Sequence, residues 1–268
     1  MSIVSYQGSK RKELDFINKW EPTEFQTVVD VFGGGANVSM FYLNRNINTI
    51  YNDINSDMVQ LLKVLRSKKN TAQLIIDYNK LRLNNSIELF YKIFDNLIDM
   101  TPECRFVYLC SNCFLGCFTK RTPKTLHKKL IQCKKIEYFE KFESKLINLE
   151  NIFNEDYKII LDKYRDMQDH FLYLDPPYLD NTSRAYNVTF TIADLEYIKS
   201  FMATCKCKVM LHLEFTGWTY YTFKKMIRET YPVHYNMTGK TKIQTLYNKY
   251  HCIITNYVNE LSPDVKKL

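Results

Sequence analysis

The sequence of 268 residues lacks any apolar run near the ~20 residues that a helix needs to span a bilayer. Its N-terminal stretch, MSIVSYQGSKRKELDF, lacks the apolar core of a signal peptide. We therefore expect an intracellular protein, in the cytoplasm, nucleoid or nucleus, without a membrane partner. In that compartment the eight cysteines are expected to be reduced thiols and not a disulfide framework. The sequence also lacks internal repeats, low-complexity segments and a Ser/His/Asp nucleophilic set.

The composition, with 46% hydrophobic and 25% charged residues, is typical of a globular protein. The length fits one large domain, or a core domain that carries an insertion. A net charge of +8 favours a polyanionic partner, most often nucleic acid or an anionic membrane surface. The 20 tyrosines and 17 phenylalanines supply rings for the core, and a nucleic-acid-binding protein uses surplus rings for stacking on bases.

The first sixty residues alternate between strand and helix patterns. A β-branched run at 27–32 predicts a buried strand, and three glycines at 33–35 follow it directly. Residues 36–43 predict a helix, and a second strand at 49–51 ends near Asp53. This order is typical of a nucleotide-binding βαβ unit, in which such an acid accepts hydrogen bonds from ribose hydroxyls. The alternative role for Asp53 is a helix N-cap or a solvated turn.

Residues 56–150 have a different pattern, with apolar residues such as Val59, Leu62 and Leu65 at helical spacing. We find no convincing strand there and predict a mostly helical insertion. Between residues 119 and 145 this segment carries nine lysines or arginines against three glutamates. The predicted organisation is an α/β domain of residues 1–55 and 151–268, interrupted by a helical, basic insertion at 56–150.

The stretch FLYLDPPYLD at 171–180 predicts a buried strand that ends in a rigid bend. Neither proline has an N–H, so the strand cannot continue through residues 176–177. Asp175 and Tyr178 flank this bend, and residues 175–178 are called the DPPY corner below. A carboxylate, an unpaired carbonyl and an aromatic face suit a planar heterocycle that bears an amino group. The alternative is a turn that ends the strand, with Asp175 as a cap.

The last ninety residues predict further α/β elements. A capping box from Thr191 to Asp194 precedes a helix at 195–202. Strands are predicted at 209–215 and 250–258, the second at or near the sheet edge. His212 and His251 lie within apolar strand patterns and are expected in the core.

Six short motifs occur in an order that resembles the Dam-type DNA adenine-N6 methyltransferases of the D12, or α, class. They are YQGSK, DVFGGGANVS, YNDIN, NEDY, YLDPPY and IITNY. The resemblance covers most of the α/β part, about two-thirds of the chain. It implies a Rossmann-like, S-adenosylmethionine (SAM)-dependent methyltransferase fold, with residues 56–150 as the inserted target-recognition domain.

The resemblance assigns roles to residues by position. Asp53 would bind the cofactor's ribose and Asp156 its adenine. The residues expected at SAM are Tyr6, Lys10, Phe32, Gly33, Gly34, Asp53, Asp156 and Asp175. The residues expected to hold the target base for catalysis are Asp175, Pro176, Pro177 and Tyr178. The product from the cofactor would be S-adenosylhomocysteine.

Further residues are expected at the DNA. Tyr186 and Phe190 resemble a family stretch that closes over a flipped adenine. The loop at 240–245 resembles the family's phosphate-binding loop, and the insertion is expected to add phosphate contacts. The basic residues expected to contact the substrate are Lys120, Arg121, Lys124, Lys240 and Lys242.

The chain departs from the family pattern at two places. Ala36 stands where many relatives have another glycine. The segment CSNCFLGC at 110–117 lies where several relatives carry an Asn-Arg-x-Gly-x-Asn-Gly-like sequence, and only Gly116 fits. The recognised DNA sequence is therefore not transferred from the family.

The cysteines of this segment raise the question of zinc. They are Cys110, Cys113 and Cys117, with Cys104 or Cys133 as a fourth ligand. Their spacing differs from paired Cys-x2-Cys zinc knuckles, and 110, 113 and 117 share one face of a helix. We therefore expect core packing and no metal.

The sequence thus predicts a site-specific SAM-dependent methyltransferase that acts on adenine N6 in double-stranded DNA after base flipping. Two enzymatic alternatives stay open, methylation of cytosine N4 and methylation of adenine in RNA. A third is a non-catalytic DNA-binding relative that acts as a partner subunit. A homodimer, and a role in restriction-modification, repair or regulation, stay equally open.

Overall fold

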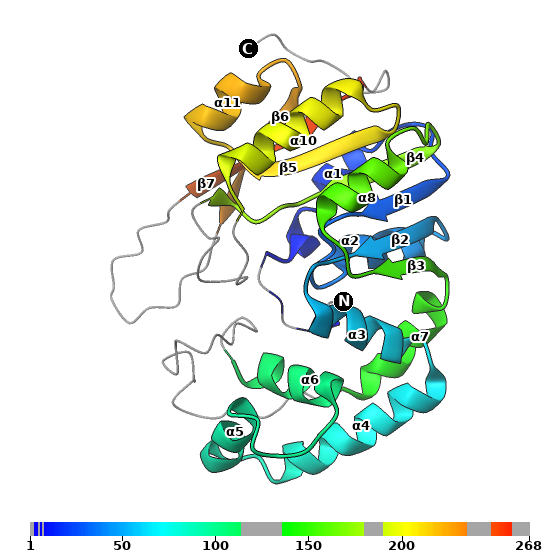
Figure 1. Cartoon of the computed structure of the whole chain (residues 1–268), viewed down its shortest axis with the longest axis vertical. Helices are drawn as coiled ribbons and strands as arrows, with labels where there is room; N and C mark the ends of the chain where they lie inside the picture. The colour runs from blue at the N-terminus through cyan, green and yellow to red at the C-terminus, as the bar shows by residue number, and fades with distance from the viewer. Residues whose placement is uncertain are drawn as a thin grey trace.

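The structure is a computed structural model that describes residues 3–4, 6, 8–113, 136–179, 190–234 and 248–258. The described part folds around a seven-stranded mixed sheet, with a helical part attached at one end (Figure 1). No helix in these ranges is both long and apolar enough to cross a bilayer. The sheet and its covering helices confirm the predicted Rossmann-like α/β fold.

The strands lie in the order β3-β2-β1-β4-β5-β7-β6. Their bounds are β1 Thr27–Asp30, β2 Asn48–Asn52, β3 Leu149–Phe153, β4 His170–Leu174, β5 Lys208–Glu214, β6 Ile227–His234 and β7 Asn248–Thr255. The first five strands pair in parallel, whereas β7 pairs antiparallel with both β5 and β6. The chain therefore builds outward from β1 to β3 and then returns to place β4 on the other side of β1.

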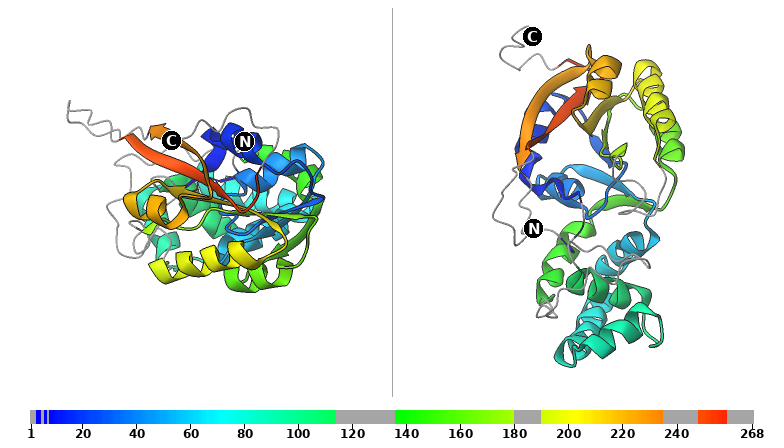
Figure 2. Two further views of the ribbon diagram at one scale, coloured as in Figure 1. Left: turned by 90° about the horizontal axis from the view of Figure 1, so that it is seen from above. Right: turned by 90° about the vertical axis from the view of Figure 1, so that its left-hand side faces the viewer.

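Helices cover both faces of the sheet (Figure 2). On one face lie α1 (Leu14–Trp20) and α2 (Asn37–Asn44), and on the other lie α8 (Tyr157–Tyr164), α10 (Ile192–Thr204) and α11 (Gly217–Phe223). Alternate residues of each strand enter the two cores: Val28 packs with α1 and α2, and Val29 with α8 and α10. Both faces are therefore apolar, as expected for a sheet buried on both sides.

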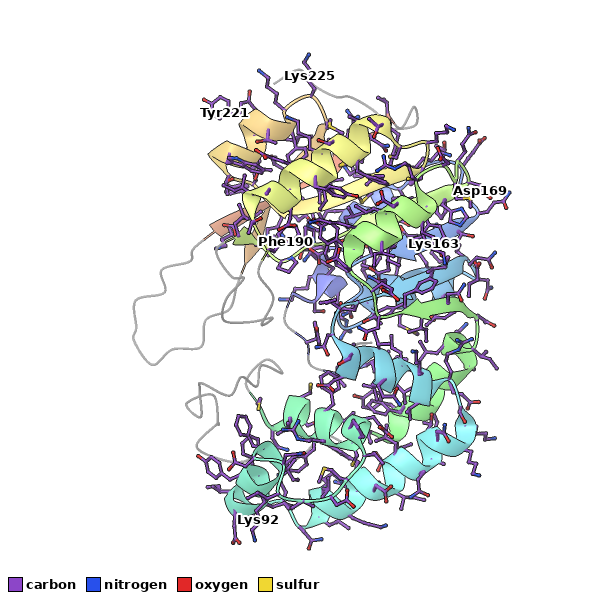
Figure 3. All side chains as sticks on the ribbon, in the orientation of Figure 1. Lys92, Lys163, Asp169, Phe190, Tyr221 and Lys225 are labelled. Atoms are coloured by element: carbon purple, nitrogen blue, oxygen red, sulfur yellow. The ribbon has the colours of Figure 1, made fainter. Side chains whose placement is uncertain are left out.

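The helical part spans residues 56–146 where the structure describes them. It contains α3 (Ser56–Leu65), α4 (Lys68–Leu83), α5 (Ile87–Phe94), α6 (Pro102–Asn112), the short 3-10 turn η4 (Glu137–Phe139) and α7 (Glu140–Leu146). Side chains of Asn55, Ser67 and Ser86 accept hydrogen bonds from first-turn N–H groups and so fix where α3, α4 and α5 begin. These helices share an apolar core that continues into the α/β part through Met40 and Leu43 on α2, Tyr51 on β2 and Leu149 on β3. Lys92 on α5 lies at the end farthest from the sheet (Figure 3).

Two strands were not predicted from the sequence. β3 is short and half exposed, because it forms one edge of the sheet. β6 forms the other edge and contains Pro232, which an edge strand tolerates because the missing N–H leaves no ladder bond unmade. The predicted strand at 250–258 therefore lies one position inside the edge, as β7.

Candidate active site

The carboxyl ends of β1 and β4 meet at the point where the strand order reverses. Ligands of open α/β sheets bind at such switch points. The N–H of Val31 donates to the carbonyl of Tyr173, with 3.0 Å between the two atoms, and so aligns the two strand ends. This alignment brings the segment after β1, with the glycine turn at 33–35, beside the DPPY corner after β4.

Asp53, at the end of β2, is hydrogen-bonded into the glycine turn. Its Oδ2 accepts from the N–H of Gly34 at 2.7 Å, and its Oδ1 accepts from the N–H of Asn55 at 2.8 Å. Burial raises the pKa of Asp53, and the two N–H groups oppose that rise. Asp53 is thus neither the N-cap of α3, which is Asn55, nor part of a solvated turn, and its predicted contact with a ribose stays a prediction. Each oxygen has a second lone pair with which to accept from a ligand.

Two tyrosines explain why this turn needs glycine. Tyr51 is fully buried and donates from its hydroxyl to the carbonyl of Gly34 at 2.8 Å. A Cβ on Gly33 would lie 2.9 Å from Tyr51 Cζ and closer still to two other ring carbons. A Cβ on Gly34, whose φ is +47°, would lie 3.2 Å from the ring of Tyr6. The turn is therefore enclosed by rings, and the predicted contact of Tyr6 with the cofactor stays a prediction.

The turn ends at Ala36, the position where many relatives have glycine. Ala36 is fully buried and adopts a left-handed conformation, with φ of 58°. Its N–H donates to the carbonyl of Gly33 at 2.8 Å, and its own carbonyl accepts from Met40. A left-handed non-glycine residue costs about 1 kcal/mol or more, so glycine would fit this position with less strain than alanine.

The DPPY corner is joined to the N-terminal segment by an ion pair. Lys10 lies in the 3-10 turn η1 (Lys10–Lys12), and its Nζ is 2.6 Å from Asp175 Oδ2. Their side chains are only 5% and 14% exposed. Lys10 Nζ also lies 5.3 Å from the centre of the Tyr178 ring. The structure therefore brings Lys10, predicted at the cofactor, to the residues predicted to hold the target base.

Aromatic rings lie beside the glycine turn, on the α8 and α10 face of the sheet. The ring of Phe32 is 5.2 Å from that of Tyr157 and 6.0 Å from that of Phe190, between centres. Phe190 is 5% exposed and lies beside the start of α10 (Figure 3). Its predicted place over the target base stays a prediction, and the structure adds its contact with Phe32.

Asp156, predicted at the cofactor's adenine, is the N-cap of α8. Its Oδ1 accepts from the N–H of Lys158 at 2.9 Å, and its side chain is exposed. Asn52 holds the preceding segment against the end of β2, because its side chain bonds both the N–H and the carbonyl of Glu155. Asp156 is thereby fixed near this edge, and its contact with a cofactor stays a prediction.

Asp30, at the end of β1, was not singled out from the sequence. It is 1% exposed, and its Oδ2 accepts from both the N–H and the hydroxyl of Ser39. Burial raises its pKa to about 7, and the charges of Asp175 and Asp53 add to the rise. The available signal was an acid inside an otherwise apolar strand.

Replacing Asp30 with asparagine is expected to change how stability depends on pH. The folded protein keeps this carboxyl protonated up to a pKa of about 7, whereas the ordinary value is 3.8. The free energy of unfolding should therefore fall between those values as pH rises, by at most ~1.4 kcal/mol per pH unit. Asparagine cannot titrate and removes this fall. Urea unfolding of both proteins between about pH 5 and 8 measures the difference.

The control for that comparison is Asp166→Asn, which changes an exposed aspartate paired with Lys206. Its free energy of unfolding should depend on pH in the same way as that of the wild-type protein. Parallel pH curves for the wild-type protein and Asp30→Asn would show that Asp30 titrates normally.

Several predicted residues cannot be compared with the structure. Lying outside the described residues are Tyr186, Lys120, Arg121, Lys124, Lys240 and Lys242, together with Cys117 and Cys133. Cys104, Cys110 and Cys113 are described, and their side chains are buried among the apolar residues of the helical part, as predicted.

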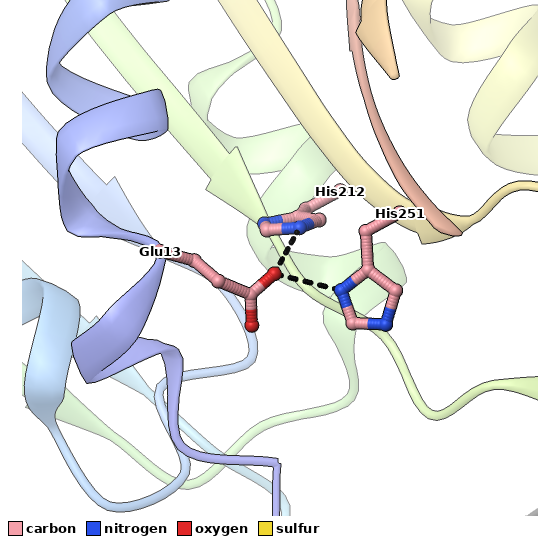
Figure 4. Close-up of side chains that lie close together, drawn as sticks. All are labelled: Glu13, His212 and His251. Carbon is pink, nitrogen blue, oxygen red and sulfur yellow. Dashed lines mark hydrogen bonds and ion pairs between the residues drawn. The ribbon is translucent and has the colours of Figure 1, made fainter. Parts of the chain in front are cut away.

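A polar cluster beside the DPPY corner was not predicted from the sequence. His212 and His251 are 0% and 1% exposed, so their prediction as core residues is confirmed. Both contact Glu13, which is also buried (Figure 4). Ligand atoms of the three residues lie within 4.8 Å of one another. No sequence spacing indicated this group, because its members are far apart in the chain.

Comparison with known proteins finds one matching family model and two similar methyltransferases. The model of the D12 class N6 adenine-specific DNA methyltransferases matches residues 6–251. The type II methyltransferase M.CviBI of Paramecium bursaria Chlorella virus NC1A is 25% identical over 275 residues, covering 95% of this chain and 99% of that protein. The modification methylase StsI of Streptococcus sanguinis is 25% identical over 196 residues, covering 69% of this chain and 30% of that protein.

Proposed function

Because the chain belongs to the D12 class N6 adenine-specific DNA methyltransferase family, we propose that the DPPY corner and the glycine turn are its active site, with SAM as methyl donor. The observation that carries the proposal is the placement of Asp175, paired with Lys10, at the switch point beside the glycine turn. The reaction is methylation of the exocyclic amine of adenine in DNA. We expect it to occur inside the cell.

The residues around the glycine turn fit the cofactor. SAM carries an adenosine group with ribose hydroxyls, and when bound it supplies a methyl group activated by a sulfonium. Asp53 is a buried carboxylate with lone pairs left for two hydroxyls. The bare backbone at Gly33 and Gly34 allows close approach of a ligand. Tyr6 and Phe32 add aromatic faces, and Asp156 would accept from the adenine.

The DPPY corner is suited to activating the target amine. The amine of adenine is a poor nucleophile, because its lone pair is delocalised into the ring. Asp175 and the carbonyl of Pro176 would accept its two N–H groups and so turn the nitrogen towards a tetrahedral geometry. Pro177 keeps the corner rigid, and Tyr178 offers its ring for stacking. Such positioning can supply on the order of 7–11 kcal/mol of the barrier reduction.

Lys10 orients the catalytic carboxylate. Its ammonium holds Asp175 Oδ2 at 2.6 Å and also contacts the carbonyl of Gly8. A charge-assisted bond of this length fixes the plane of the carboxylate before substrate arrives. Preorganised acceptors need no rearrangement during the reaction, which is the source of much enzymatic rate enhancement.

The helical part, within residues 56–150, is proposed as the target-recognition domain for double-stranded DNA. Its basic segment would contact phosphates, together with the basic loop at 240–245. Adenine must leave the duplex to reach the corner, at a cost of a few kcal/mol. Tyr186 and Phe190 are proposed to cover the extruded base.

The proposal is tested by identifying the methylated product. The purified protein is incubated with methyl-labelled SAM in two separate reactions, one with duplex DNA and one with RNA. The nucleosides are then separated and analysed by mass spectrometry. We expect N6-methyldeoxyadenosine from the DNA. Label on cytosine N4 or only in RNA would replace the assigned substrate, and failure to bind SAM in calorimetry would overturn the assigned donor.

A further inference from the structure

We infer that Glu13, His212 and His251 form a positioning cluster that holds Lys10 and Tyr178 in their places at the DPPY corner. The inference rests on the proposed function of that corner. The three residues touch neither the proposed base nor the proposed cofactor. Their effect on the reaction would therefore pass through the two residues that do.

Glu13 is the centre of the cluster (Figure 4). Its Oε2 lies 2.7 Å from His251 Nδ1 and 3.0 Å from His212 Nε2, and it accepts from the hydroxyl of Tyr231 at 2.9 Å. Glu13 follows η1, whereas His212 lies on β5 and His251 on β7. One carboxylate oxygen thus joins the N-terminal segment to two strands of the sheet.

The link to Lys10 is a single turn of backbone. The N–H of Glu13 donates to the carbonyl of Lys10 at 2.8 Å and closes η1. This turn therefore carries the lysine that pairs with Asp175 and also the carboxylate that binds both histidines. A shift of Glu13 would move Lys10 away from the catalytic carboxylate.

The link to Tyr178 is the ring of His251. The two rings meet edge to face, with 5.2 Å between their centres and 84° between their planes. The hydroxyl of Tyr178 lies 3.5 Å from His251 Nδ1, the atom that bonds Glu13. His251 thus stands between Glu13 and the tyrosine that is proposed to stack on the target base.

The pKa shifts and hydrogen bonds of the cluster are consistent with an ionised Glu13 beside a neutral His212. Burial would raise the pKa of Glu13, but hydrogen bonds from His212 and His251, and the charge of Lys10, lower it far below its usual value. Burial lowers the pKa of His212, which favours its neutral ring. The hydroxyl of Tyr173 lies 2.9 Å from His212 Nδ1, and a neutral His212 with its proton on Nε2 would accept there and donate towards Glu13 and Tyr231. The charges of Lys10 and Asp175 also act on His212. Tyr178 and Cys252 act on Tyr173 and Tyr231, the two tyrosines that contact His212.

A metal ion is the competing explanation, since a carboxylate and two imidazoles are common ligands. In the structure, however, each of the three ligand atoms already has a hydrogen-bond partner within the cluster. Protons alone therefore satisfy these buried groups, as expected of buried polar atoms. The geometry therefore favours a hydrogen-bonded positioning cluster over a metal site.

Glu13→Gln tests the inference, because it keeps the size of the side chain and removes its charge. We expect kcat to fall by about tenfold to a hundredfold, with the Kd for SAM changed less than about threefold. Removing the opposite charge of Glu13 lowers the pKa of the His212 imidazole, so the acid limb of the kcat–pH profile should move to lower pH. A residue that only stabilised the fold would leave that limb in place.

Two further variants complete the test. Glu229→Gln is the matched control, because Glu229 is a carboxylate that binds Lys19 and Trp20 away from the corner, and it should leave kcat and the pH profile unchanged. His251→Asn keeps a donor for Glu13 but removes the ring beside Tyr178, so kcat should also fall in this variant. If Glu13→Gln does not fold, His251→Asn alone tests whether the cluster positions Tyr178.

Three results would overturn the inference. One is wild-type kcat with an unmoved acid limb in Glu13→Gln, and another is wild-type kcat in His251→Asn. The third is stoichiometric metal in the purified protein that Glu13→Gln loses and that the reaction requires. Failure of the proposed function would differ from all of these, because the wild-type protein itself would then transfer no methyl group.

Discussion

Asp175→Ala is expected to reduce methyl transfer by on the order of 10³-fold or more, with little change in SAM affinity. The substitution removes an acceptor for the target amine, and the carbonyl of Pro176 alone cannot fix that amine. It also leaves the ammonium of Lys10, whose side chain is 5% exposed, without its carboxylate. Single-turnover rates with labelled SAM measure the first effect, and calorimetry measures the second.

The loss of the ion pair must be separated from the loss of the acceptor. Removing one member of a buried pair can cost about 3–5 kcal/mol of stability, so melting curves should accompany the rates. Asp175→Asn keeps the shape and one acceptor and should be folded but strongly impaired. Asp169→Ala, at the exposed opposite end of β4, is the matched control and should retain full activity (Figure 3). Turnover by Asp175→Ala near the wild-type rate would refute the assigned role.

Gly33→Ala is expected to abolish SAM binding and to destabilise the fold by about 2–3 kcal/mol. The added methyl group would overlap the ring of Tyr51. That ring is fully buried and hydrogen-bonded to Gly34, so it cannot move aside without disturbing the turn. The backbone of the glycine turn would have to move instead, together with its bond to Asp53. Thermal unfolding and calorimetric titration with SAM measure the two losses.

Gly217→Ala is the matched control for that substitution. Gly217 is the first residue of α11, and nothing lies within 4 Å of a Cβ placed there. Alanine is the better helix former, so this variant should be as stable as the wild-type protein or slightly more stable. If the Gly33→Ala protein bound SAM with unchanged affinity, the glycine turn would not lie close to the cofactor.

The sequence predicted the central elements of the fold well, because their signals are local. The β-branched run before the glycines became β1, and the capping box from Thr191 to Asp194 begins α10 as expected. The edge strands β3 and β6 were missed, because they are half exposed or contain proline and so lack the strong apolar pattern of a central strand.

The candidate site was predicted in part. The glycine turn, Asp53 and the DPPY corner are each short motifs, and parallel strands bring their ends to one edge of the sheet. The pair between Lys10 and Asp175 joins residues far apart in the chain and leaves no pattern in the sequence. The burial of His212 could be predicted from its apolar neighbours, but its contact with Glu13 depends on how α1 docks against β5 and β7.

During translation, Glu13 leaves the ribosome 238 residues ahead of His251, its partner on β7. Almost the whole polypeptide must therefore be synthesised before the carboxylate of Glu13 can contact His251 and help to hold Lys10 at the DPPY corner. The contacts of Glu13 with both histidines are complete only when β7 enters the sheet between β5 and β6. The surroundings of Lys10 are therefore completed late in synthesis.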